Sequence, residues 1–109
     1  MVYWLKSIFT NHKKEEKRRY ALYYELFSKF LEQHNAKLLS LEYFYKLMGS
    51  MILTFEYNGT VHTCKCDRDN IYLDKEFICN GSYHIPGRDD SKDQMMKTIE
   101  ERVFQNSEN

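Results

Sequence analysis

The residues with the most chemistry to offer lie in and after one short segment: His62, Cys64 and Cys66 stand at every second position, and Cys79 and His84 follow. Imidazole and thiolate groups are zinc ligands, and a cysteine with a histidine base is a common nucleophile. Residues two apart on a strand lie about 7 Å apart on one face, which suits a single tetrahedral metal poorly. We therefore expect the cysteines to pack in the core, with no catalytic residue, metal or cofactor, and zinc binding remains the alternative.

Other binding motifs match only in part. Asp67-x-Asp69 begins like a calcium loop, but Ile71 stands at position five and no glycine occupies position six. The four glycines are scattered, so no glycine-rich phosphate loop is present. Two glutamates interrupt the basic run that begins at Lys13, which favours a solvated helix face over a phosphate site.

Acidic residues gather in the second half of the chain. Residues 47–109 hold eleven Asp and Glu against seven Lys and Arg, whereas residues 1–46 hold five Glu against nine Lys and Arg. The acidic set is either a solvated edge or a face that recognises a basic protein partner, since charge raises association rates and orients the partner. On the second interpretation, the predicted partner-binding residues are Asp67, Asp69, Asp74, Asp89 and Asp90, with Tyr72 and Tyr83 as aromatic anchors.

The strongest structural signal is a β-hairpin over residues 51–66. Asn58-Gly59 separates two runs of strand-forming residues and favours a two-residue type I′ turn, in which both central residues have positive φ. This turn predicts a register that places the apolar side chains on one face, in the pairs Tyr57–Thr60, Phe55–His62, Leu53–Cys64 and Met51–Cys66. The opposite face is mixed and can meet water.

Residues 37–48 are compatible with a strand or a short helix. Apolar residues alternate from Leu39 to Leu47, so we favour the strand. A connection of odd length over residues 48–50 keeps these side chains on the core face, and it predicts the pairs Leu47–Met51, Tyr45–Leu53 and Tyr43–Phe55.

Shorter strands are expected after the hairpin. Residues 71–73 follow a polar turn and predict a fourth strand, after which residues 74–76 turn the chain again. Residues 77–79 and 83–85 flank Asn80-Gly81, which predicts a second and weaker hairpin.

Helical spacing marks the first third of the chain. In residues 13–34, aromatic and apolar side chains recur every three or four positions, and Asn11 is the expected N-cap of this helix. The same spacing in residues 1–10 predicts a separate amphipathic helix that lies on the domain as a lid, with a membrane-surface anchor as the alternative.

A second helix is expected near the C-terminus. Ser91 and Gln94 match a capping box, and the apolar stripe that follows comprises Met95 or Met96, Ile99 and Val103. Residues 105–109 are expected to fray. The predicted fold is a single α+β domain over residues 1–109, an antiparallel sheet of three to five strands with a long N-terminal helix and a C-terminal helix on one face.

Composition narrows the class of protein. A chain of 109 residues with three cysteines and no secretory signal predicts one core and a reducing, cytoplasmic setting. No apolar run approaches the length of about 20 residues that spans a bilayer. Sixteen basic residues balance sixteen acidic ones, so nucleic acid is not the expected partner. The abundance of Lys, Asn, Ile and Tyr indicates AT-rich codons, typical of a low-GC bacterium or its mobile element.

Residues 54–59 (TFEYNG), followed by Asp67-Arg68 and residues 71–73 (IYL), resemble small bacterial proteins of the toxin-immunity type. The resemblance covers roughly residues 40–85. It implies an α+β domain that blocks a cognate toxin by occlusion, without catalytic residues, and the toxin is often a nuclease with a basic cleft. Two alternatives are a double-stranded nucleic-acid-binding domain, whose order is helix, three strands and helix, and a self-associating structural or regulatory subunit.

Overall fold

The computed structural model describes residues 2–44, 50–67, 70–80 and 91–105, which form one α+β unit. Its elements, in chain order, are helix α1 (Val2–Gln33), strands β1 (Lys37–Phe44), β2 (Ser50–Tyr57), β3 (Thr60–Asp67), β4 (Asn70–Leu73) and β5 (Glu76–Asn80), helix α2 (Ser91–Ile99) and the π-helical turn η2 (Glu100–Phe104). The strands form one antiparallel sheet in the order β1-β2-β3-β4-β5. The predicted α+β fold is confirmed.

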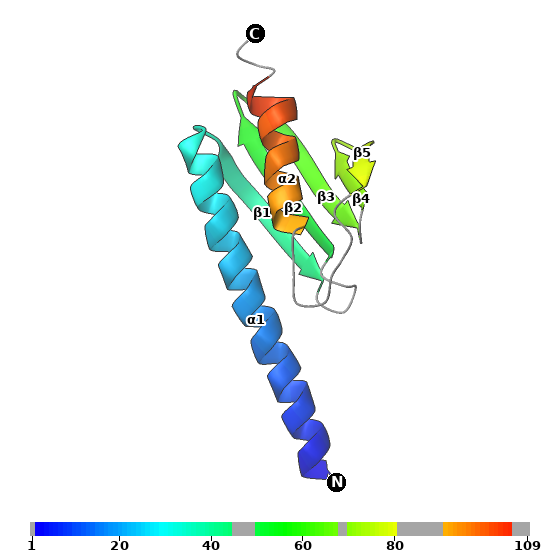
Figure 1. Cartoon of the computed structure of the whole chain (residues 1–109). Helices are drawn as coiled ribbons and strands as arrows, with labels where there is room; N and C mark the ends of the chain where they lie inside the picture. The colour runs from blue at the N-terminus through cyan, green and yellow to red at the C-terminus, as the bar shows by residue number, and fades with distance from the viewer. Residues whose placement is uncertain (1, 45–49, 68–69, 81–90, 106–109) are drawn as a thin grey trace.

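Both helices cover the same face of the sheet. Helix α1 runs beside β1, and α2 lies over the middle strands (Figure 1). The core between these layers is made chiefly of fully buried side chains from both helices and from strands β2, β3 and β4, namely Phe27, Leu31, Met51, Leu53, Phe55, Cys64, Cys66, Ile71, Met95 and Ile99. The N-terminal turns of α1 project past the end of the sheet (Figure 1).

The hairpin of β2 and β3 has the predicted register. Asn58 and Gly59 both have positive φ, at 51° and 79°, as a type I′ turn requires. Strand β2 pairs with β3 from Tyr57–Thr60 through Met51–Cys66. The resulting core face is dry: Met51 and Cys64 are 0% exposed.

The predicted strand in residues 37–48 is confirmed over β1, but its predicted register is wrong. Tyr43 pairs with Met51 and Leu41 with Leu53, so the connection spans residues 45–49 rather than 48–50. The connection is still odd in length, and Tyr43 and Leu41 therefore keep the core face. The predicted partners Tyr45 and Leu47 lie outside the described residues.

A bulge in β1 also overturns the predicted alternation. The register shifts between Leu38 and Ser40, so that Leu38 pairs with Phe55 and Leu39 is the extra residue. Leu38 packs against the core, whereas Leu39 is 43% exposed. The sequence pattern had placed Leu39 on the core face, because a bulge leaves no simple trace in an alternating pattern.

Helix α1 is continuous from Val2 to Gln33, so Asn11 is not its N-cap and residues 2–10 do not form a separate helix. The physical reason is that no glycine or proline lies between Val2 and Gln33 to stop the helix, and a single Asn in a helix interior costs only a few tenths of a kcal/mol. The predicted lid is likewise not what Figure 1 shows, since the first turns of α1 lead away from the sheet.

The C-terminal part agrees with the predicted helix and adds a π-helical turn. Met95 and Ile99 are 0% exposed, and Val103 and Phe104 are both buried. Two consecutive side chains share the core because the amide of Gln105 donates to the carbonyl of Glu100 (2.9 Å), which widens the turn by one residue. The predicted second arm in residues 83–85 lies outside the described ranges, and so do residues 106–109 of the end that was predicted to fray from residue 105.

Candidate functional site

The face of the sheet opposite the helices is the best candidate surface, and we call it the open face. None of the described helices covers it (Figure 1). The strand registers align one side chain from each strand in a row across this face: Glu42, Ile52, Lys65, Tyr72 and Phe77. The row ends in two adjacent aromatic rings, so the open face is apolar on the β4–β5 side.

Lys65 lies at the centre of this row and is near two side chains, Tyr72 in the row and Asp67 beside it on β3. Its Nζ is 5.8 Å from the centre of the Tyr72 ring and 3.9 Å from Oδ2 of Asp67. The Tyr72 ring meets Phe77 edge to face, with 5.7 Å between ring centres. Phe77 is 52% exposed, and the lysine and aspartate side chains are about half exposed. Exposed ion pairs of this kind contribute little to stability, so these groups are available to a partner.

Asp74 is the best-anchored carboxylate near this surface. Asp74 and Lys75 have φ of 51° and 72°, and they form the tight turn between β4 and β5. Asp74 Oδ1 accepts a hydrogen bond from the amide of Thr63 (2.9 Å), and Oδ2 lies 2.7 Å from Nδ1 of His62. The amide of Asp74 donates to the carbonyl of Thr63 (2.8 Å). These contacts fasten the β4–β5 turn to β3.

The pair of His62 and Asp74 has the geometry of an oriented imidazole, which sequence reasoning had not found. The imidazole ring of His62 stacks on the ring of Phe55, with 5.4 Å between ring centres. The nearest candidate nucleophile along the strand, Cys64, is 0% exposed and faces the core. In the described ranges, no three His, Cys, Asp or Glu side chains group as a metal site. The arrangement therefore suits a structural fastening of the turn. The turn predicted over residues 74–76 is confirmed and is confined to Asp74 and Lys75, because β5 already begins at Glu76.

Of the predicted partner-binding residues, the structure brings two together. Asp67 and Tyr72 share the open face, with Lys65 between them. Asp74 lies at the other end of β4, where its carboxylate is used by His62 and Thr63. The remaining four, Asp69, Tyr83, Asp89 and Asp90, lie outside the described residues.

Replacing Asp74 by alanine should lower the free energy of unfolding by about 1 to 2 kcal/mol, because the amide of Thr63 loses its acceptor and alanine disfavours positive φ. Urea denaturation measures the change. Asp67→Ala is the matched control, since among the described residues its carboxylate pairs only with Lys65, at 3.9 Å and half exposed, and it should stay within about 0.5 kcal/mol of the original chain. Equal effects of the two substitutions would contradict the fastening role of Asp74.

A second charged group lies on α1. Glu15 accepts hydrogen bonds from Arg18 (2.6 and 3.1 Å) and Arg19 (2.9 Å). Hydrogen bonding to Arg18 and then to Arg19 lowers the pKa of Glu15 to about 2. The pKa of Arg19 is raised by its hydrogen bonds to Glu15 and, next, to Tyr43 of β1. Arg19 thus connects this ion-pair group to the sheet.

The depressed pKa of Glu15 predicts a pH dependence. Its ordinary pKa is 4.5 and its folded pKa about 2, so its stabilising effect is present above pH 4.5 and is lost as the pH falls towards 2. The stability difference between the original chain and Glu15→Gln, measured by denaturant unfolding, should shrink over this interval. Glu16→Gln is the control, because Glu16 has no ion pair among the described residues. A difference for Glu15→Gln that is constant from pH 7 to 2 would contradict this account.

Comparison with protein-family models, with curated proteins and with solved structures gives no significant match, so the class that can be stated is the α+β fold itself. Within the described residues, no helix combines the length and apolar character needed to cross a membrane. The surfaces of the described residues are therefore the features that bear on function.

Proposed function

We propose that this chain is a small non-enzymatic binding protein of the inhibitor or immunity type, which blocks a partner protein through the open face. The observation that carries the proposal is the row across the sheet that ends in Tyr72 and Phe77. Aromatic side chains that are exposed on a rigid scaffold are typical anchors of protein interfaces. Tyr72 and Phe77 lie on adjacent, paired strands. Both rings can therefore insert into a partner's surface together, without a change in the backbone of this chain.

The size of the open face fits part of a protein interface. Five strands spaced about 4.8 Å apart, with same-face residues about 7 Å apart, present on the order of 500 Å². A standard interface buries about 800 Å² on each partner. The open face would therefore supply more than half of a standard contact, and its margins would supply the rest.

The charges of the open face define the partner. Asp67 is half exposed and is held only loosely by Lys65, so a basic group of the partner can compete for it. The matching partner surface has an apolar centre for Tyr72 and Phe77 and a cationic group beside it. A nuclease-type toxin with a basic cleft fits this description. A cytoplasmic setting in a low-GC bacterium, or on its mobile element, belongs to the same proposal.

The test is capture of a partner with the tagged full-length chain and with a Tyr72→Ala/Phe77→Ala variant. We expect the original chain to retain one protein and the double variant to weaken that association at least thirtyfold, since two anchors are lost. Tyr24→Ala is the matched control, because Tyr24 is 43% exposed on α1, away from the open face. Retention of the partner by the double variant, with its circular dichroism unchanged, would overturn the proposal.

The two alternatives give different results in simple measurements. A self-associating subunit would sediment as an oligomer on its own, whereas an inhibitor of another protein need not. A binder of double-stranded nucleic acid would shift duplex RNA in a gel, and added salt would weaken the shift. The described strands form a sheet of five, whereas the order expected of the double-stranded nucleic-acid-binding domain has three strands between its helices.

A further inference from the structure

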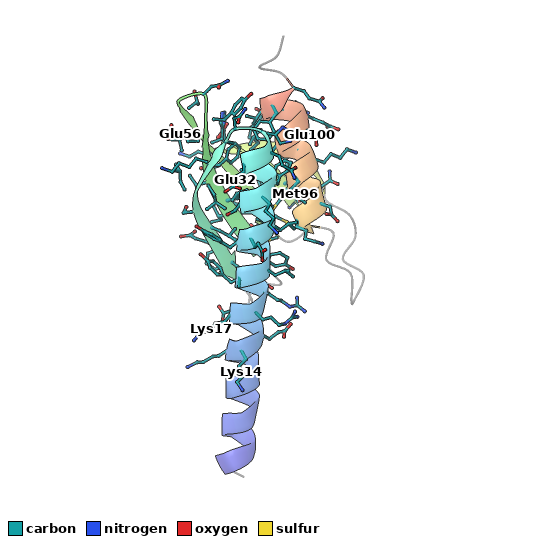
Figure 2. All side chains as sticks on the ribbon, turned by 90° about the vertical axis from the view of Figure 1, so that its left-hand side faces the viewer. Lys14, Lys17, Glu32, Glu56, Met96 and Glu100 are labelled. Atoms are coloured by element: carbon teal, nitrogen blue, oxygen red, sulfur yellow. The ribbon has the colours of Figure 1, made fainter. Side chains whose placement is uncertain are left out.

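A pocket lies between α1 and the end of β1, on the other side of the sheet from Tyr72 and Phe77. Its volume is about 520 Å³, and its described lining consists of Lys13, Glu16, Lys17, Tyr20 and Tyr43. Four of these residues come from α1 at spacings of three and four, so they share one face of the helix. Figure 2 shows Lys14 and Lys17 on the part of α1 that projects past the sheet. Pockets of this volume accept small organic ligands.

The described lining of the pocket carries a net positive charge, from Lys13 and Lys17 against Glu16. Glu15 is occupied by Arg18 and Arg19. Within the described part of the chain, neither Lys13 nor Lys17 has an ion pair, although Glu16 lies between them in the sequence. Residues four apart on a helix are close enough for both ammonium groups to contact one anion.

The rest of the described lining is aromatic. Tyr43 is 8% exposed, and its ring meets Tyr23 edge to face with 5.2 Å between ring centres. A hydrogen bond with Arg19 also fixes the position of Tyr43, so Tyr43 forms a rigid floor of the pocket. Tyr20 is 39% exposed, and its ring centre lies 6.0 Å from that of Tyr24. Exposed aromatic rings are stacking surfaces for nucleobases.

We infer that this pocket binds a phosphorylated aromatic ligand of the size of a nucleoside monophosphate. The phosphate contacts Lys13 and Lys17. The nucleobase packs against Tyr20, above Tyr43 at the floor of the pocket. Glu16 accepts a hydrogen bond from a sugar hydroxyl or an exocyclic amine. The carboxylate also disfavours polyphosphates and other highly charged anions, because like charges repel. This site is separate from the open face and does not depend on the proposed inhibitor function.

The test is a titration of the full chain with adenosine monophosphate, monitored by isothermal titration calorimetry. We expect saturable one-to-one binding with a Kd at or below about 1 mM, and weaker binding as salt is added. Lys13→Gln/Lys17→Gln should weaken binding at least tenfold, and Tyr20→Ala should weaken it severalfold. Lys14→Gln removes one exposed charge from the same helix without touching the lining, so its Kd should stay within about twofold of the original.

Adenosine and inorganic phosphate separate the two halves of the ligand. Each should bind at least tenfold more weakly than adenosine monophosphate, because each fills one half of the pocket. Phosphate binding as tight as that of the nucleotide would overturn the inference, since it would describe a simple anion site. Absence of binding at 10 mM nucleotide, on the order of ten times the expected Kd, would overturn it as well. Unchanged binding in the double lysine variant would place the nucleotide elsewhere and have the same consequence.

Discussion

Replacing Phe55 by alanine should lower the free energy of unfolding by about 3 to 5 kcal/mol, the range for a large aromatic deleted from a packed core. Phe55 is 0% exposed. Its ring stacks on His62 at 5.4 Å and lies 6.3 Å from the ring of Phe104. Its removal therefore leaves a cavity where β2, β3 and the C-terminal turn meet. Equilibrium urea denaturation at neutral pH measures the loss.

The matched control is Phe77→Ala, the same chemical change at a ring that is 52% exposed on the open face. This variant should stay within about 0.5 kcal/mol of the original chain. The contrast separates the two faces of one sheet: the covered face holds the fold together, whereas the open face is free to bind. Comparable losses at Phe55 and Phe77 would show that the open face is covered in solution.

Replacing Ile99 by aspartate should abolish cooperative folding. Ile99 is 0% exposed on α2, which packs on β3 and β4. A buried carboxylate with no partner costs on the order of 5 kcal/mol, which is as much as the whole stability of many small domains. The expected result is loss of the thermal transition and of near-ultraviolet circular dichroism.

Lys97→Asp is the control for this substitution, because Lys97 is exposed two residues away on the same helix. It introduces the same side chain and should leave the transition in place. If Ile99→Asp unfolded with an unchanged midpoint, α2 would not be part of the core. The two variants together therefore test whether the sheet depends on this helix for its dry face.

The candidate sites were less accessible to sequence reasoning than the fold. Tyr72 and Asp67 were predicted as contacts, and the open face contains both. The pocket residues Lys13 and Lys17 were interpreted as part of a solvated helix face, because nothing in the local sequence reveals that Tyr43 of β1 lies beside them. The carboxylate that orients His62 is twelve residues away in the sequence. The first arrangement requires α1 to pack on β1, and the second requires β3 to pair with β4.

The sequence by itself determined the β2–β3 hairpin, its register and its dry face. The physical reason is local: Asn58 and Gly59 accept positive φ, and a two-residue turn leaves one alignment of the strands. The tertiary structure alone decided the longer β1–β2 connection, the bulge at Leu39 and the contact of Asp74 with His62. In those places several local conformations cost nearly the same, and the burial of Leu38, Leu41 and Tyr43 against the helices selects one of them.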